Sequence, residues 1–192
     1  MTTQSFCPKL LVVLLTGAFA HMQAAADTPA DAPFIQADAH LPRSGAGAHR
    51  PLVHVAVGVL MRDDGAFLLT TRPAGKVYAG YWEFPGGKLE AGETVAQALA
   101  RELHEEIGFA PAASAICAWR ELRVDYPHAL VQLHFCQVRV GPAAPPLHMR
   151  EGQRHAWLTL PLPAHIAPVL PGALPVLQWL AEGAAPRPQP AP

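Results

Sequence analysis

The stretch GKLEAGETVAQALARELHEEIGF, residues 87–109, decides the fold of this chain. It predicts a helix over residues 94–107, because apolar side chains recur there at successive i, i+4 positions. These are Val95, Leu99, Leu103 and Ile107. Thr94 and Gln97 have the spacing of a capping box, and Gly108 stands where a helix C-terminal glycine belongs. We expect the apolar stripe to pack on a β-sheet.

Three glutamates, Glu102, Glu105 and Glu106, share the face of this helix opposite the stripe. Clustered carboxylates suit a hard divalent cation such as Mg²⁺, although a solvated acidic face is the commoner meaning of such spacing alone. The segment Phe84-Pro85-Gly86-Gly87-Lys88 directly precedes the helix. It favours the metal interpretation, because a glycine-bearing loop can approach phosphate and offer a backbone carbonyl.

Strands are predicted on both sides of the helix. Two pairs of alternating apolar segments predict hairpins, the first turning at Asp64-Gly65, and a shorter segment predicts one more strand. The segments are Val53 to Met61 with Ala66 to Thr71, Ala115 to Asp125 with Leu130 to Val140, and Ala156 to Leu160. A second helix is predicted at about Ala173 to Ala181. This order favours an α+β fold, with a mixed sheet between helices.

The folded domain is predicted to span residues 51–183, with other segments at both ends. Leu10 to Ala20 is an apolar run closed by Ala18-Phe19-Ala20, as in a signal peptide, but it is too short to span a membrane. Residues 21–50 and 184–192 have the composition of a disordered linker and tail. Either the leader directs export, or the start is assigned too far upstream. We expect a cytoplasmic protein, exported only if the signal peptide is genuine.

The composition excludes several classes of partner. Only 15% of the residues are charged and the net charge is −1, so we expect no nucleic-acid polymer as a partner. Our further expectations are a small-molecule substrate and a monomer or homodimer. Cys7, Cys117 and Cys136 lie too far apart for a zinc or disulfide framework, and the last two are expected in the core. The histidines lack metal-ligand spacing, and none is given a catalytic role.

The same stretch resembles the complete signature of the Nudix hydrolases, G-x5-E-x7-R-E-U-x-E-E-x-G-U, where U is apolar. Gly87, Glu93 and the run from Arg101 to Phe109 match it. The resemblance covers about Val53 to Leu180 and is closest to the MutT type, which shares the segment Glu83 to Lys88. It implies an α/β/α sandwich with a mixed β-sheet.

The resemblance also implies a reaction. Water would attack a phosphorus of a nucleoside triphosphate, 8-oxo-dGTP being the first to test, and release a monophosphate and pyrophosphate in nucleotide-pool sanitation and DNA repair. The cofactor would be Mg²⁺, with Mn²⁺ as a substitute. Glu102 would orient or deprotonate the water, and Arg101 would brace the carboxylates. The implied metal ligands are the Gly86 carbonyl, Glu102, Glu105, Glu106 and Glu151.

The implied substrate-binding residues include two cations for phosphate, Arg72 and Lys88, and aromatic rings that could stack on a base. The whole set is Arg72, Glu83, Phe84, Pro85, Gly86, Lys88 and Tyr126, with Trp82 as a further aromatic candidate.

The chain departs from the MutT pattern at two positions that bear on the base. An asparagine in a P-x-N-x-P motif is replaced by Ala173, between Pro171 and Pro175, and a histidine before E-F-P-G-G is replaced by Val77. Losing a group that pairs with the base lowers discrimination. A Nudix hydrolase for a dinucleotide or nucleotide sugar is therefore the alternative. A Nudix-fold binding module is disfavoured, because every glutamate of the signature is present.

Overall fold

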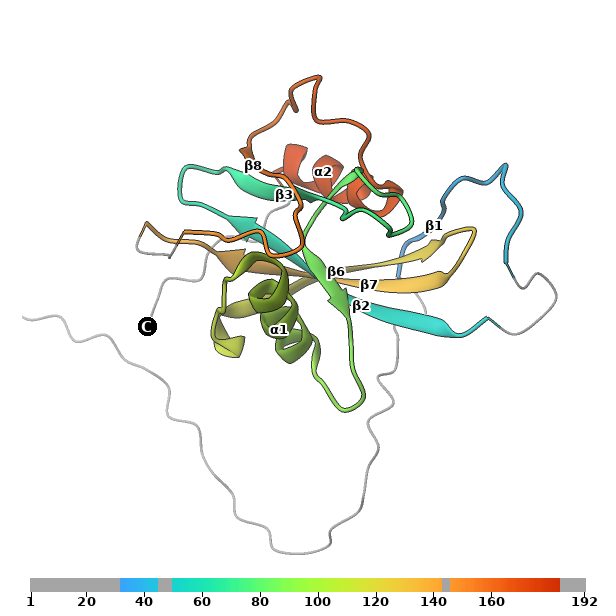
Figure 1. Ribbon diagram of the computed structural model, residues 1–192, viewed down its shortest axis with the longest axis horizontal. Coiled ribbons are helices and arrows are strands. Elements are labelled where there is room, and N and C mark those ends of the chain that lie inside the picture. Colours follow the sequence, from blue (N-terminus) through green and yellow to red (C-terminus); the bar gives the residue numbers. More distant parts are fainter. Residues whose placement is uncertain (1–31, 45–49, 143–145, 184–192) are drawn as a thin grey trace, which may run out of the picture. The chain divides into compact units, whose positions relative to one another are not determined.

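A mixed β-sheet occupies the centre of the computed structural model (Figure 1), which describes residues 32–44, 50–142 and 146–183. Its strand order is β1-β6-β7-β2-β3-β4, with β5 pairing β2 and β8 pairing β3. The strands are β1 (Phe34–Gln36), β2 (Leu52–Met61), β3 (Phe67–Thr71), β4 (Trp82–Glu83), β5 (Gly86–Lys88), β6 (Ile116–Asp125), β7 (Leu130–Arg139) and β8 (His155–Leu158). Expectations for residues 1–31, 45–49 and 184–192 lie outside the described residues.

Strand β2 organises the sheet. Along its whole length it pairs parallel with β7, from Leu52 opposite Leu130 to Met61 opposite Arg139. Its other edge is antiparallel to β3 and, around Val57, to β5. The two predicted hairpins are confirmed as β2–β3 and β6–β7, and the predicted single strand as β8.

Helix α1 (Val95–Ile107) confirms the predicted helix and its caps. The Gln97 amide donates to the Thr94 hydroxyl over 3.2 Å, and the Thr94 amide donates to Gln97 Oε1 over 2.9 Å. Gly108 ends the helix in a left-handed conformation with φ 68°. Such a cap satisfies amide and carbonyl groups that the helix leaves unpaired at its ends.

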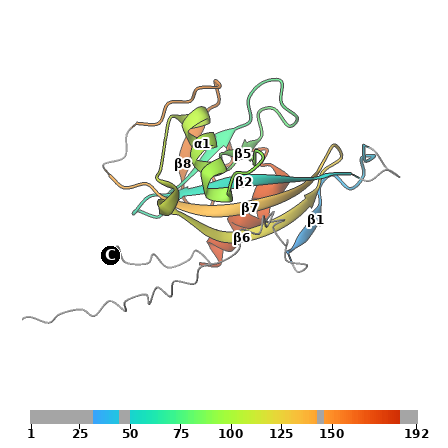
Figure 2. The same ribbon diagram turned by 90° about the horizontal axis from the view of Figure 1, so that it is seen from below.

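The two helices cover opposite faces of the sheet (Figure 2). Leu99, Leu103 and Ile107 of α1 are fully buried in one cluster, which includes Leu60 of β2. Helix α2 (Leu174–Ala181) follows the 3-10 turn η2 (Pro171–Ala173) and packs in the other cluster, with Phe135 of β7. A second 3-10 turn, η1 (Ala113–Ala115), leads into β6. The predicted α/β/α sandwich with a mixed sheet is confirmed.

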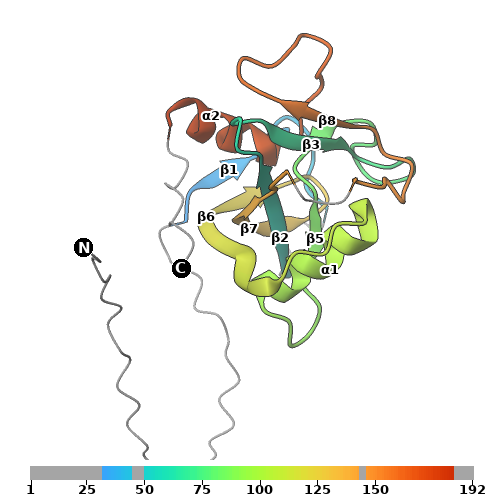
Figure 3. The ribbon, with the colours of Figure 1, turned by 90° about the vertical axis from the view of Figure 1, so that its left-hand side faces the viewer.

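Two expectations are wrong. Part of the segment expected as a disordered linker forms β1, which runs parallel to β6 with Phe34 opposite Arg123 (Figure 3). The reason is that β6 has a free edge, whose backbone groups gain hydrogen bonds from an added strand. Cys136 is buried as expected, but Cys117 is exposed, close to the register shift of β6 between Ala118 and Arg120.

Within the described ranges, no helix is both long and apolar enough to cross a bilayer.

The capping box yields a test of the fold. Thr94→Ala removes the side chain that accepts the Gln97 amide, so the free energy of unfolding should fall by about 1 kcal/mol. Urea denaturation measures it. Thr159→Ala is the control, because Thr159 is exposed and follows β8. Equal losses in the two variants would contradict the assigned cap.

Candidate active site

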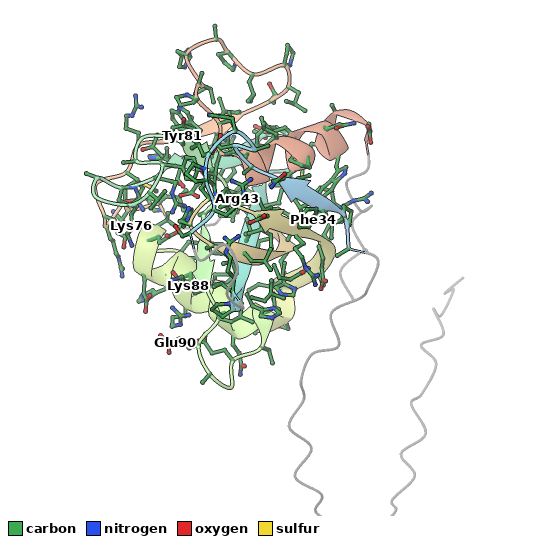
Figure 4. The ribbon with its side chains drawn as sticks, turned by 90° about the vertical axis from the view of Figure 1, so that its right-hand side faces the viewer. Phe34, Arg43, Lys76, Tyr81, Lys88 and Glu90 are labelled. Carbon is green, nitrogen blue, oxygen red and sulfur yellow. The ribbon has the colours of Figure 1, made fainter. Side chains whose placement is uncertain are left out.

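A cavity of about 540 Å³ brings together residues from β2, the loop after β3, the β4–β5 turn, α1, the β6–β7 turn and η2. Its lining contains both charged and aromatic residues. The charged residues are Arg72, Lys76, Glu83, Lys88, Glu102, Glu106 and Glu151. The aromatic residues are Tyr78, Tyr126 and His128, together with Phe84 and Phe135. Figure 4 shows Lys76 and Lys88 on one side of the molecule. The cavity therefore combines phosphate-binding chemistry with flat apolar surfaces.

Two glycines let the carboxylates of α1 reach the β5 backbone. The Gly86 amide donates to Glu106 Oε2 over 3.1 Å. A Cβ at Gly87 would lie 2.1 Å from Cδ of Glu102, and a Cβ at Gly86 would lie 2.1 Å from the Ala56 carbonyl oxygen. Gly86 also has φ 146°, which side chains rarely allow. A side chain at Gly86 would clash with the β2 backbone, and one at Gly87 would displace the Glu102 carboxylate.

Arg101 fixes the carboxylates around it. Its Nε and Nη2 donate to the two oxygens of Glu93 over 2.8 and 2.9 Å. Its Nη1 donates to Glu102 over 2.9 Å and to Glu105 over 3.3 Å. The hydrogen bonds from Arg101 lower the pKa of Glu93 to about 2. The bidentate pair with Glu93 fixes the guanidinium, whose Nη1 then orients Glu102 through a single hydrogen bond. Arg101 itself is absent from the cavity lining.

Burial disfavours the ionised form of two carboxyl groups beside the glycines. It raises the pKa of Glu106 to about 8, with further contributions from Glu83, Glu102 and Glu151, against the Gly86 hydrogen bond that lowers it. Burial also raises the pKa of Glu83 to about 7, although Arg72 lies 2.6 Å away and opposes the shift. Carboxylates that disfavour one another are stabilised by a nearby cation.

The donor atoms fit a hard divalent cation, since carboxylate and carbonyl oxygens are what Mg²⁺ binds. Glu102, Glu106 and Gly86 all line the cavity. In the part of the chain that the structure describes, however, no three His, Cys, Asp or Glu side chains are grouped as a metal site. Glu102 is held by Arg101 and Glu106 by the Gly86 amide. The predicted ligand set stays a prediction.

Most of the predicted site residues line the cavity, and three do not. Those in the lining are Arg72, Glu83, Phe84, Gly86, Lys88, Glu102, Glu106, Tyr126 and Glu151. Pro85 is buried, and its carbonyl accepts the Gly58 amide over 2.8 Å. Glu105 keeps 57% of its side chain exposed. Arg101 acts through its neighbours. The further aromatic candidate, Trp82, is buried outside the lining, so it is poorly placed to stack on a base.

The sequence did not reveal Lys76, Tyr78 and His128 as cavity residues. Tyr78 has a left-handed backbone with φ 62°, in a loop whose course no periodicity predicts. His128 stands two residues after Tyr126 in the β6–β7 turn. The only signal in the sequence is for His128, which stands in the same turn as the predicted substrate-binding residue Tyr126.

The position of the missing asparagine does face the cavity. Ala173 lines it, and the neighbouring Gly172 amide donates to the Tyr126 hydroxyl over 3.2 Å. A Cβ at Gly172 would lie 2.6 Å from that hydroxyl oxygen. Burial raises the pKa of Tyr126 to about 12, so the phenol keeps its proton. Tyr126 thus places a hydroxyl close to Ala173, whose side chain has no polar group.

Comparisons with known proteins agree with this geometry. The family described as NUDIX domain matches residues 52–180. This chain belongs to the Nudix family, and it is a hydrolase of the MutT type, acting on pyrophosphate bonds.

Three relatives illustrate the similarity. The 8-oxo-dGTP diphosphatase of Haemophilus influenzae is 36% identical over 57% of this chain and 77% of its own length. The CTP pyrophosphohydrolase of Escherichia coli is 34% identical over 64% of this chain and 87% of its own length. A structure from a study of MutT from Aliivibrio salmonicida and Vibrio cholerae is 32% identical, has a TM-score of 0.54, and covers 69% of this chain and 99% of its own.

The two glycines should respond differently to alanine. Gly86→Ala meets backbone and a forbidden φ, so we expect it to lower the free energy of unfolding by at least about 2 kcal/mol. Gly87→Ala meets only the end of the flexible Glu102 side chain, which can rotate away, so the loss should stay within about 1 kcal/mol. Urea denaturation followed by tryptophan fluorescence measures both. Similar losses would show that the loop is not held as described.

Proposed function

We propose that this enzyme is a Mg²⁺-dependent pyrophosphohydrolase that converts nucleoside triphosphates into monophosphate and pyrophosphate, with 8-oxo-dGTP as the first substrate to test. One observation carries the proposal. The same cavity holds the signature carboxylates Glu102 and Glu106, the cation Lys88 and the aromatic ring of Tyr126. Relatives named 8-oxo-dGTP diphosphatase support it. Such an enzyme would remove oxidised nucleotides before they enter DNA.

The phosphates would meet the cations of the cavity. Lys88 is exposed in the lining and forms no salt bridge with a carboxylate among the described residues, so its ammonium is available to a phosphate. Arg72 lies 2.6 Å from Glu83 and also donates to the Val77 carbonyl over 2.7 Å. It would approach phosphate from a fixed position. A lysine and a braced arginine are both suited to phosphate oxygens.

Glu102 and Glu106 would hold Mg²⁺ together with the Gly86 carbonyl, and Glu105 and Glu151 remain additional candidates. When bound, Mg²⁺ lowers the pKa of a coordinated water and neutralises phosphate charge; Mn²⁺ would substitute. Glu102 is oriented by Arg101, so it is the residue proposed to align the attacking water or accept its proton. Glu106 accepts the Gly86 amide, so it links α1 to the loop that would lie against the phosphates.

A second substrate class is favoured by one observation. Ala173 offers no amide to a base edge, so selectivity for 8-oxoguanine would have to come from other groups, such as the Tyr126 hydroxyl. A relative named CTP pyrophosphohydrolase shares 34% identity. The alternative is therefore another nucleoside phosphate, such as CTP, a dinucleotide or a nucleotide sugar.

The direct experiment incubates the full chain with Mg²⁺ and a panel of substrates. The panel contains ordinary and oxidised nucleoside triphosphates, a dinucleotide and a nucleotide sugar, and both pyrophosphate and monophosphate release are measured. We expect selective release of pyrophosphate from 8-oxo-dGTP. Preference for CTP, a dinucleotide or a nucleotide sugar would keep the chemistry and overturn the sanitising role.

We place the enzyme in the cytoplasm as a monomer or homodimer.

Glu106→Gln tests the metal assignment. It keeps the shape of the side chain but removes the charge, so Mg²⁺-dependent turnover should fall by roughly 100-fold or more. The circular dichroism spectrum should not change. Glu182→Gln is the matched control, because Glu182 is an exposed glutamate at the end of α2. Near-normal turnover by Glu106→Gln would remove this carboxylate from the site.

A further inference from the structure

The segment 33–44 lies outside the matched Nudix domain, 52–180, yet it packs on that domain. After β1, the Ala37 amide donates to the Asp125 carbonyl over 3.1 Å, and the Ser44 amide donates to the Pro127 carbonyl over 2.6 Å. The segment therefore follows the end of β6 and the β6–β7 turn, as Figure 3 shows for β1.

Two arginines, Arg43 within this segment and Arg50 after it, form salt bridges with the carboxylate of Asp125 at the end of β6. Arg43 Nε lies 3.4 Å and Arg50 Nη1 lies 2.6 Å from Asp125. Arg43 also donates to the Ala37 and Asp38 carbonyls over 2.7 and 3.2 Å, which closes the segment on itself. Arg50 donates to the Tyr126 carbonyl over 2.8 Å. Figure 4 shows Arg43 on the same side of the molecule as Lys76 and Lys88.

One hydrogen bond connects the segment to the cavity wall. The Tyr78 hydroxyl donates to Asp38 Oδ2. Within residues 32–44, 50–142 and 146–183, Asp38 and Tyr78 are the two non-glycine residues with positive φ, 46° and 62°. Two strained residues that bind each other indicate a conformation maintained by its surroundings, which is common at functional sites.

Tyr78 belongs to a continuous aromatic wall. Its ring centroid lies 5.7 Å from that of Tyr126 and 6.0 Å from that of His128, and the latter two are 5.5 Å apart. All three residues line the cavity. Burial is the largest cause that raises the pKa of Tyr78 above its usual value, and the hydrogen bond to Asp38 is the second. The hydroxyl therefore remains a donor. Flat rings of this kind suit a nucleobase, since every base offers an apolar face.

We propose that Asp38 is a positioning residue, which holds Tyr78 so that Tyr78, Tyr126 and His128 form the wall for the base of the substrate. The inference rests on the proposed nucleotide substrate. It adds that a segment outside the Nudix match completes the pocket, and that base affinity depends on that segment while the reaction at the phosphates does not.

The test compares Asp38→Ala and Tyr78→Phe with Asp63→Ala. The first two remove the same hydrogen bond. The control removes Asp63, an exposed aspartate of the β2–β3 turn that pairs with Arg139 of β7. For the preferred nucleoside triphosphate, KM should rise roughly tenfold in either test variant while kcat stays within about twofold. KM for ribose 5′-triphosphate, which has no base, should not change. The double variant should match the single ones.

A KM equal to that of Asp63→Ala, a fall in kcat, an equal loss on ribose 5′-triphosphate, or additive effects in the double variant would each overturn the inference. Hydrogen–deuterium exchange of residues 73–81 without substrate provides a readout independent of turnover. It should increase in Asp38→Ala, and unchanged exchange would also overturn the positioning role. If the wild-type protein turns over no nucleotide, the proposed function fails, while the exchange measurement still decides whether Asp38 holds the loop.

Discussion

The close approach of α1 to the β5 backbone is the constraint on which the site depends. It exists because Gly87 carries no side chain where Cδ of Glu102 comes within 2.1 Å of the position that a Cβ would take. Gly86 likewise carries none where the Ala56 carbonyl oxygen of β2 comes within 2.1 Å of such a position. β2 pairs with β5 and supports the loop from below, while the buried stripe of α1 holds the helix on the sheet. Arg101 then fixes Glu102 laterally. The hydrophobic core and the acidic site thus share one arrangement of elements.

The local patterns of the sequence predicted most of the fold. The stripe of α1, its Thr94 cap and the two hairpins rest on residues close together in the chain, so periodicity and turn chemistry suffice. Strand β1 was missed because three residues are too few to show alternation and its stability comes from β6, almost ninety residues later, with Phe34 opposite Arg123. The exposure of Cys117 depends on irregular pairing in β6, which alternation does not encode.

The site was predicted unevenly for the same reason. Glu102 and Glu106 belong to a contiguous signature, and both reach the cavity, whereas Glu105 on the same helix face is largely exposed. Tyr78 and Asp38 could not be found, since their contact joins two irregular segments. The proposed chemistry at the phosphates therefore rests on residues of the family signature, whereas the proposed recognition of the base rests on residues outside it, such as Tyr78 and Asp38.

The most direct measurement is an equilibrium titration with Mn²⁺, followed through the paramagnetic resonance signal of the free ion, on wild-type protein and Gly87→Ala. It asks whether the approach of Glu102 to the β5 backbone builds a cation site, without relying on turnover. We expect wild type to remove Mn²⁺ from solution and Gly87→Ala to bind it at least roughly tenfold more weakly. Equal affinity in two folded proteins, or no binding by wild type, would contradict the account.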